Sequence, residues 1–94
     1  EPRPEPEREG LGLEVRPNPF RGKATVTLTL ARPSEVEVAV YDVLGRRVAV
    51  LAGGVYGAGR HVLTLDGTDL PAGVYVVRAS AGGVVAAHTV TLLR

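Results

Sequence analysis

Short segments in which apolar and polar residues alternate are the feature that most constrains the fold of this chain. Residues 11–16, 24–30 and 35–40 each carry an aliphatic side chain at every second position, with Gly, Ala, Thr or a charged residue between. A period of two is typical of a strand with one buried face. Residues 48–51, 61–66, 74–80 and 84–93 complete seven predicted strands. No segment shows sustained helical periodicity bounded by caps, so an all-β fold is predicted.

Turn signals separate the predicted strands. They are Pro, Gly, Asp and Ser clusters at residues 32–34, 44–46, 53–54, 66–68, 70–73 and 82–83. Seven short strands at this spacing favour a seven-stranded antiparallel immunoglobulin-like β-sandwich. The chain has no Cys and no Trp, so "immunoglobulin-like" describes the architecture alone.

The predicted core is small and mostly aliphatic. It takes the inward-facing side chains of the strands together with Phe20. Its members are Leu13, Val15, Phe20, Val26, Leu28, Leu30, Val36, Val38, Val40, Leu63, Leu65, Tyr75, Val77, Val90 and Leu92.

The first ten residues, EPRPEPEREG, differ in composition from the rest. Pro alternates with charged residues there, and such a segment has too little apolar surface to offset the entropy of ordering. Residues 1–10 are therefore interpreted as a semi-rigid linker and residues 11–94 as one domain. The chain contains no Met and no signal peptide pattern, so a piece of a longer polypeptide is expected, with a further part upstream that the linker spaces from this domain.

Charge and cysteine content exclude several kinds of site. The formal net charge of +1 gives no basis for binding nucleic acid or an anionic membrane surface. No apolar run is long enough for a membrane-spanning helix, and no membrane insertion is expected. The absence of Cys excludes disulfides, thiol nucleophiles and Cys-ligated zinc.

The polar residues favour no reaction chemistry. Asp42 and Asp66 adjoin predicted turns, where their carboxylates are expected to accept local backbone hydrogen bonds. Asp66 and Asp69 together are a weak signal for a cation, because a calcium loop needs more oxygens at a set spacing. His61 and His88 have no second ligand at metal-binding spacing. No catalytic, metal or cofactor-binding residue is therefore predicted, and no cofactor.

Outer-face and aromatic residues are read as structural. Thr25, Thr27, Thr29 and Thr91 are expected on outer strand faces, as strand propensity explains. Phe20 and Tyr75 are expected to be buried anchors. Tyr56, placed in a predicted loop over residues 53–59, is the one ring expected to be exposed.

The Pro17-Asn18-Pro19-Phe20 segment follows the first predicted strand. Two Pro fix the backbone φ angle, and the residue before a Pro is held extended. The segment is therefore predicted to form a rigid corner that places Phe20 in the end of the sandwich.

Five segments, in this order, resemble a known family. They are Asn18-Pro19-Phe20, residues 38–48 with Asp42 and Gly45, Gly59-Arg60-His61-Val62, Pro71-Ala72-Gly73-Val74-Tyr75, and the apolar last strand ending in Arg94. Together they resemble the C-terminal sorting domain of proteins exported by the bacterial type IX secretion system, type A. The resemblance covers residues 11–94. Two positions depart from the pattern: Leu65 stands where Trp is common, and His88-Thr89 replace a common Lys.

The resemblance implies a function and a set of residues. It implies a non-catalytic signal that is recognised after export to the periplasm, by an outer-membrane translocon and a surface sortase-like protease, and that brings its cargo to the cell surface. The sorting candidates that it implies are Val90, Thr91, Leu92, Leu93 and Arg94. The family-motif residues expected to be structural are Pro17, Asn18, Pro19, Phe20, Asp42, Gly45, Gly73 and Tyr75. A monomer is expected.

Two other functions remain open at this point. The pattern is also similar to the immunoglobulin-like domain of the flagellar hook-capping protein, which would make the chain a structural spacer. A third reading is a carbohydrate-binding module attached to a secreted hydrolase.

Overall fold

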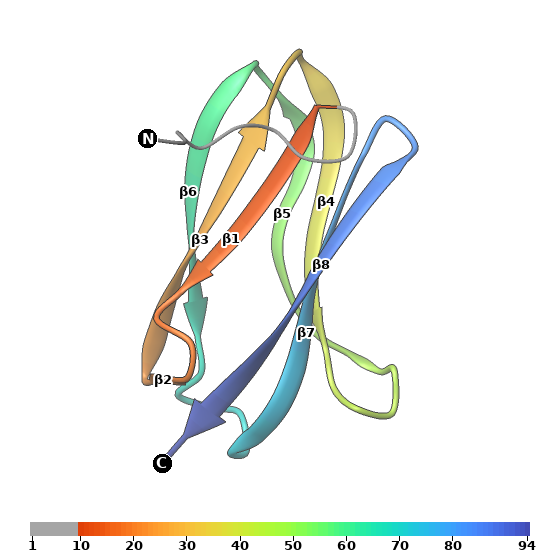
Figure 1. Cartoon of the computed structure of the whole chain (residues 1–94). Helices are drawn as coiled ribbons and strands as arrows, with labels where there is room; N and C mark the ends of the chain where they lie inside the picture. The colour runs from red at the N-terminus through yellow and green to blue at the C-terminus, as the bar shows by residue number, and fades with distance from the viewer. Residues whose placement is uncertain (1–9) are drawn as a thin grey trace.

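Two packed β-sheets make up the computed structural model, which describes residues 10–94 (Figure 1). Its strands, in chain order, are β1 (Leu11–Arg16), β2 (Phe20–Arg21), β3 (Lys23–Leu30), β4 (Ser34–Tyr41), β5 (Arg47–Tyr56), β6 (Gly59–Asp66), β7 (Gly73–Ala81) and β8 (Val84–Leu93). The predicted linker lies outside the described residues except for Gly10. The carbonyl oxygen of Gly10 accepts a hydrogen bond from the Ala31 backbone N–H at 2.9 Å, which ties the start of β1 to the end of β3. Over residues 10–94 there is no helix that could span a membrane.

The sheets contain three and five strands, in the orders β1-β3-β6 and β2-β8-β7-β4-β5. The predicted all-β architecture of two sheets is therefore confirmed. The count of seven strands is wrong, because Phe20 and Arg21 form an additional strand, β2, that is too short for an alternating pattern to reveal. β2 pairs parallel to β8, whereas the other strand pairs are antiparallel.

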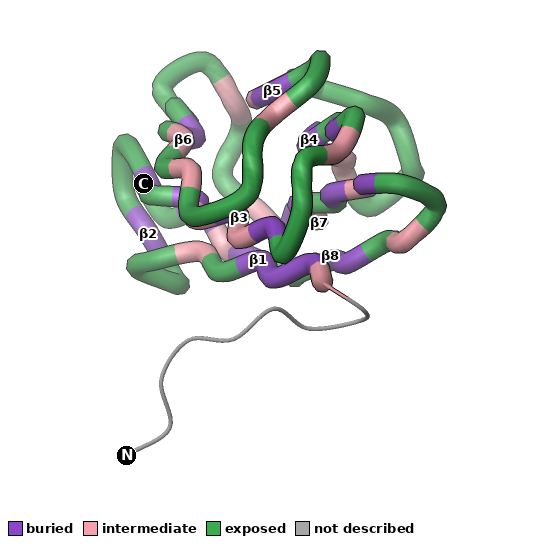
Figure 2. Tube along the Cα trace, turned by 90° about the horizontal axis from the view of Figure 1, so that it is seen from above, coloured by how far each residue is buried: buried purple, intermediate pink, exposed green. Residues whose placement is uncertain are grey.

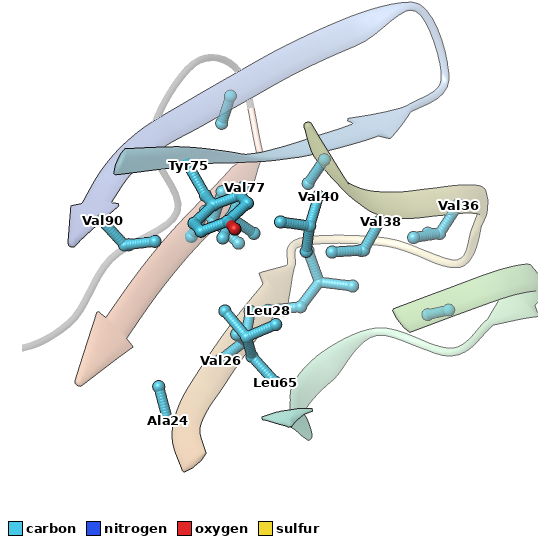
Figure 3. Packing of buried hydrophobic residues seen from close by; sticks show 14 of the residues in the cluster. Ala24, Val26, Leu28, Val36, Val38, Val40, Leu65, Tyr75, Val77 and Val90 are labelled. Atoms are coloured by element: carbon cyan, nitrogen blue, oxygen red, sulfur yellow. The ribbon is translucent and has the colours of Figure 1, made fainter. Parts of the chain in front are cut away.

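The core lies between the two sheets, where the buried segments of the chain gather (Figure 2). Val26, Leu28 and Leu65 from the small sheet point toward Val38, Val40, Tyr75 and Val77 from the large one (Figure 3). The predicted core residues are buried, with two exceptions.

The exceptions, Val15 and Leu63, are only half-buried. They lie on β1 and β6, the two edge strands of the three-stranded sheet, where no further strand covers them. The prediction omitted Leu11 and six buried alanines, at positions 24, 39, 52, 79, 81 and 86. Alanine fits where the sheets approach closely, and its small side chain gives little signal in the sequence.

Strand β5 is longer than predicted. The predicted turn at Gly53-Gly54 is wrong, since both residues lie within β5 and pair with Glu37 and Val36 of β4. The pairing partner β4 therefore overrides the local turn preference of the two glycines. The β4–β5 register shifts twice, between Val38 and Ala39 and between Val40 and Tyr41. Bulges of this kind twist an exposed edge strand away from pairing with another chain.

Candidate functional site

The end of β8 is held from both sides. One side pairs with β7, and the other contacts the segment Pro17–Arg21, named here the strand clamp. Within the clamp, Asn18 Nδ2 donates to the carbonyl oxygen of Thr89 at 2.9 Å. Asn18 Oδ1 accepts from the backbone N–H of Thr91 at 3.0 Å. The side-chain amide of Asn18 thus forms the two hydrogen bonds with the backbone of β8 that a peptide group of a neighbouring strand would form.

The rest of the clamp continues along β8 as strand β2. Phe20 pairs with Leu92 and Arg21 with Leu93. Phe20 is 1% exposed, which confirms its predicted role as a plug in the core. Arg21 Nη1 donates to the main-chain oxygen of Arg94 at 2.6 Å. The clamp therefore covers the outer edge of β8 from Thr89 to the last residue.

Pro17 and Pro19 are exposed at the corner of the clamp, between β1 and β2. The peptide bonds that precede them, Arg16-Pro17 and Asn18-Pro19, are both cis. The corner leaves Asn18 facing the edge of β8 and Phe20 in the core, so the predicted chain corner is present.

Gly67 completes the surroundings of Leu92. Its backbone N–H donates to the carbonyl oxygen of Gly22 at 2.7 Å, and it is buried. A Cβ atom at this position would lie 3.0 Å from Leu92 Cδ2 and 3.2 Å from the Gly22 oxygen. The sequence predicted only a turn here. This close approach joins segments far apart in the chain, and nothing local in the sequence signals it.

The five sorting candidates differ in how accessible they are. Val90 and Leu92 are each 1% exposed and belong to the core. Thr91 is half-exposed, whereas Leu93 is 36% exposed and Arg94 is exposed. Because the clamp already occupies the backbone edge, a partner can reach only the side chains of Thr91, Leu93 and Arg94 without displacing it.

A second group of motif residues forms the turn between β4 and β5. Asp42 Oδ1 accepts hydrogen bonds from the backbone N–H groups of Leu44 and Arg46, both at 2.9 Å. Asp42 Oδ2 pairs with Arg46 Nε at 2.8 Å. These contacts, the Arg46 backbone N–H first among them, lower the pKa of Asp42. The predicted turn role of Asp42 is confirmed, and Gly45 supplies the positive φ of 82° that the turn needs.

The third group lies at the start of β7. Tyr75 is 5% exposed and pairs with Val90 of β8, and its hydroxyl donates to the carbonyl oxygen of Pro71. Gly73 pairs with Leu92. The strand clamp and the start of β7 therefore flank the same stretch of β8.

The histidines and aromatic residues are engaged in local contacts or face solvent. His61 Nε2 lies 2.7 Å from the Gly57 carbonyl oxygen, and its ring meets the edge of Tyr56 with centroids 5.1 Å apart. Tyr56 ends β5 and is half-buried, so the prediction of an exposed ring in a loop is wrong. His88 is exposed on β8.

The carboxylates of the described residues, 10–94, form no cation site. Asp66 Oδ1 accepts from the Thr68 backbone N–H at 2.9 Å, and hydrogen bonds from Thr68 lower its pKa. This is the predicted turn role. Asp69 is exposed in the same loop. Residues 10–94 contain no group of three or more His, Asp or Glu side chains that could hold a metal ion.

A surface hollow on the three-stranded sheet also lacks reactive groups. It measures about 590 Å³ and lies over the outer face of β1, β3 and β6, where Thr25 and Thr27 line it. Its one carboxylate, Glu14, pairs with Arg16 at 2.6 Å. The remaining charged residue in the lining is Arg60, so no acid and base converge there.

The family described as the secretion system C-terminal sorting domain matches residues 14–91. That range includes the whole strand clamp, most of β8, the Asp42 turn and the start of β7. The chain belongs to this family. No curated protein and no solved structure matches the sorting domain. Members of the family serve type IX secretion and are not catalytic, so this sorting domain belongs to an exported protein and acts in protein transport.

Proposed function

We propose that residues 10–94 are the signal by which the type IX system exports a cargo domain attached N-terminally in the same polypeptide. The cargo passes through the periplasm and the outer-membrane translocon, and a sortase-like protease acts on the domain at the cell surface. The family match over residues 14–91 is the observation that carries this proposal. The arrangement of motif residues around β8 supports it.

The accessible side chains of the last strand are the proposed recognition surface. Thr91 and Leu93 lie on the outer face of the five-stranded sheet, and Arg94 follows them. The clamp fixes their positions, so a receptor would meet a preorganised surface and lose little conformational entropy on binding. Recognition by added backbone pairing would instead require the clamp to leave β8.

A reporter fusion tests the proposal. The full chain is fused behind an export signal and a reporter in a bacterium that has the type IX system, and reporter is measured in the periplasm and at the surface. The parent fusion should reach the surface. The variant T91A/L93A/R94A should retain reporter in the periplasm while its melting temperature stays within a few degrees of the parent.

Deletion of residues 90–94 is not a clean test, because it removes the buried side chains of Val90 and Leu92 together with the accessible ones. If the parent fusion stays in the periplasm of a competent host, the sorting proposal is wrong and a structural spacer like the hook-capping domain replaces it. If the parent is exported and the triple variant is exported equally well, the signal lies elsewhere in the domain. Measured affinity for a polysaccharide would instead favour the carbohydrate-binding reading, although the half-buried Tyr56 offers no flat exposed ring.

A further inference from the structure

Two adjacent aliphatic side chains protrude from the turn between β4 and β5. Val43 is 74% exposed and Leu44 is 73% exposed, so neither contributes to the core. Turn positions of this kind usually carry polar residues or glycine. A single exposed Leu or Val is ordinary, but two side by side form a continuous apolar patch that packing does not explain. Val43 and Leu44 are named here the apolar tip.

The apolar tip sits on a rigid support. Asp42 donates its backbone N–H to the Arg46 carbonyl oxygen at 2.9 Å and accepts the backbone N–H of Gly45 at 3.0 Å. Its carboxylate accepts hydrogen bonds from the backbone N–H groups of Leu44 and Arg46. Hydrogen bonds from Asp42 therefore fix the backbone of the turn on both sides of the tip. A partner that binds the tip would not have to order it first.

The tip lies at the same end of the molecule as the accessible part of β8. β4 and β8 run in the same direction on either side of β7, with Tyr41 opposite Val76 and Val76 opposite Thr89. Both strands therefore end at the same end of the sheet, where Figure 1 shows the β4–β5 turn and the C-terminus. Val74 and Leu93, 43% and 36% exposed, add apolar surface at this end.

We propose that the apolar tip is an anchor by which a protein component of the type IX outer-membrane machinery binds this domain. The complementary surface is an aliphatic pocket for Val43 and Leu44 with a carboxylate at its rim. The rim carboxylate follows from Arg46, whose side chain is 72% exposed and whose only ion pair within residues 10–94 uses Nε. The Nη1 and Nη2 donors remain available for a bidentate contact. This inference rests on the proposed sorting function and names a contact for it.

The chemistry of the tip favours a protein over a lipid surface. Of the two cations next to the tip, Arg47 is paired with Glu37 at 2.6 Å, so an anionic membrane would find only the Nη1 and Nη2 donors of Arg46. An anionic membrane would therefore gain little from them. Two aliphatic side chains also bring less apolar surface than one myristoyl chain, which alone binds membranes only marginally.

A second copy of the chain is also disfavoured as the occupant. A stable dimer buries about 800 Å² on each partner, far more than a two-residue tip provides. A small, rigid apolar group with an adjacent Arg is instead typical of the hot spots that fill a pocket on a larger partner.

The export assay is the first test. The variant V43T/L44Q should lower surface reporter about tenfold, the effect of losing about 1.4 kcal/mol of binding, with a melting temperature near that of the parent. The matched control is V55T/V62T, which alters two exposed valines, 78% and 66% exposed, away from the tip. It should be exported like the parent.

Cross-linking identifies the occupant. Since the chain has no cysteine, Val43→Cys and the control Val62→Cys each give a unique site for a thiol-linked photo-cross-linker. The labelled full-length chain is irradiated with outer-membrane vesicles from the type IX host, and separately with protein-free vesicles of the same lipids. The label at position 43 should yield an adduct with a translocon component, identified by mass, and the label at position 62 should not.

The outcomes separate this inference from the proposed function. If the parent is not exported, the sorting function itself is wrong. If the parent and V43T/L44Q are exported equally, the apolar tip is not an anchor and the sorting function stands. An adduct with lipid, with a second copy of the chain or with an unrelated protein would also overturn the assignment of the tip.

Discussion

Leu92→Ala and Leu93→Ala are the pair of substitutions that best tests the role of the last strand. The two residues are neighbours on β8, and the chemical change is identical. Leu92 is 1% exposed and contacts the Phe20 and Gly67 region of the core, whereas Leu93 is 36% exposed on the outer face. We expect the first substitution to destabilise the domain strongly and the second only slightly.

The magnitude follows from the burial of Leu92. At about 0.8 kcal/mol for each buried carbon, the three carbons removed account for about 2.4 kcal/mol. The cavity that remains adds to this, so a total of about 3–4 kcal/mol is expected. A 94-residue chain has roughly 5–14 kcal/mol of stability in all, so Leu92→Ala removes a large share of it. Leu93→Ala should cost about 1 kcal/mol or less, because its side chain has no layer packed over it.

Guanidinium unfolding followed by circular dichroism measures both values. With a slope of about 2 kcal/mol per molar, Leu92→Ala should lower the midpoint by about 1.5–2 M and Leu93→Ala by about 0.5 M or less. The slope itself should stay constant. Equal midpoints for the two variants would refute the reasoning, since the last strand would then not belong to the cooperative core.

Three further substitutions probe the clamp and the turn. Gly67→Ala should cost about 1–3 kcal/mol in unfolding free energy, because its Cβ would press on Leu92; a midpoint equal to that of the parent would contradict the close approach. Asn18→Ala should cost about 1–2 kcal/mol and speed amide exchange at Thr91, whose N–H would lose its partner; unchanged exchange would argue against the clamp. Asp42→Asn should be less stable than the parent at neutral pH. Since the folded pKa of Asp42 is lowered, its contribution is present above its ordinary value of 3.8 and is lost as pH falls through the folded pKa. The gap between parent and variant in thermal midpoint should therefore narrow below pH 3.8, and a constant gap down to pH 2 would refute this.

Alternation of apolar and polar residues made most of the strands predictable. Val26, Leu28 and Leu30 on one segment, and Val36 and Val38 on another, face the core as their spacing indicates. This pattern depends only on which face of a strand is buried, and it needs no knowledge of the pairing partner.

Features that depend on a partner strand could not be predicted in the same way. Gly53 and Gly54 have the local chemistry of a turn, yet pairing with β4 keeps them in a strand. Strand β2 exists only because Leu92 and Leu93 lie beside Phe20 and Arg21, far away in the sequence. Gly67 is required by Leu92 and Gly22 rather than by its own turn. Each of these features is set by long-range pairing.

The candidate site could be predicted only in part, because it also depends on pairing between segments far apart in the sequence. The motif residues were identified in the sequence, but only the structure shows that they support the same strand, β8. Asn18 replaces a missing strand partner of β8, Phe20 fills the core beside Leu92, and Tyr75 pairs with Val90. A substitution at any of them therefore changes stability first, and a loss of export caused by it would not identify a contact with the secretion machinery.

The motif residues that the fold does not need are the better guide to recognition. Asp42 and Gly45 build the β4–β5 turn, but the turn would form equally well with polar residues between them. Val43 and Leu44 are nevertheless apolar and exposed, and they lie at the same end of the sheet as Leu93. Packing gives no reason for two adjacent apolar side chains on a turn, so we infer a binding partner for this pair. Experiments on sorting should therefore begin with these three side chains rather than with the buried residues of the clamp.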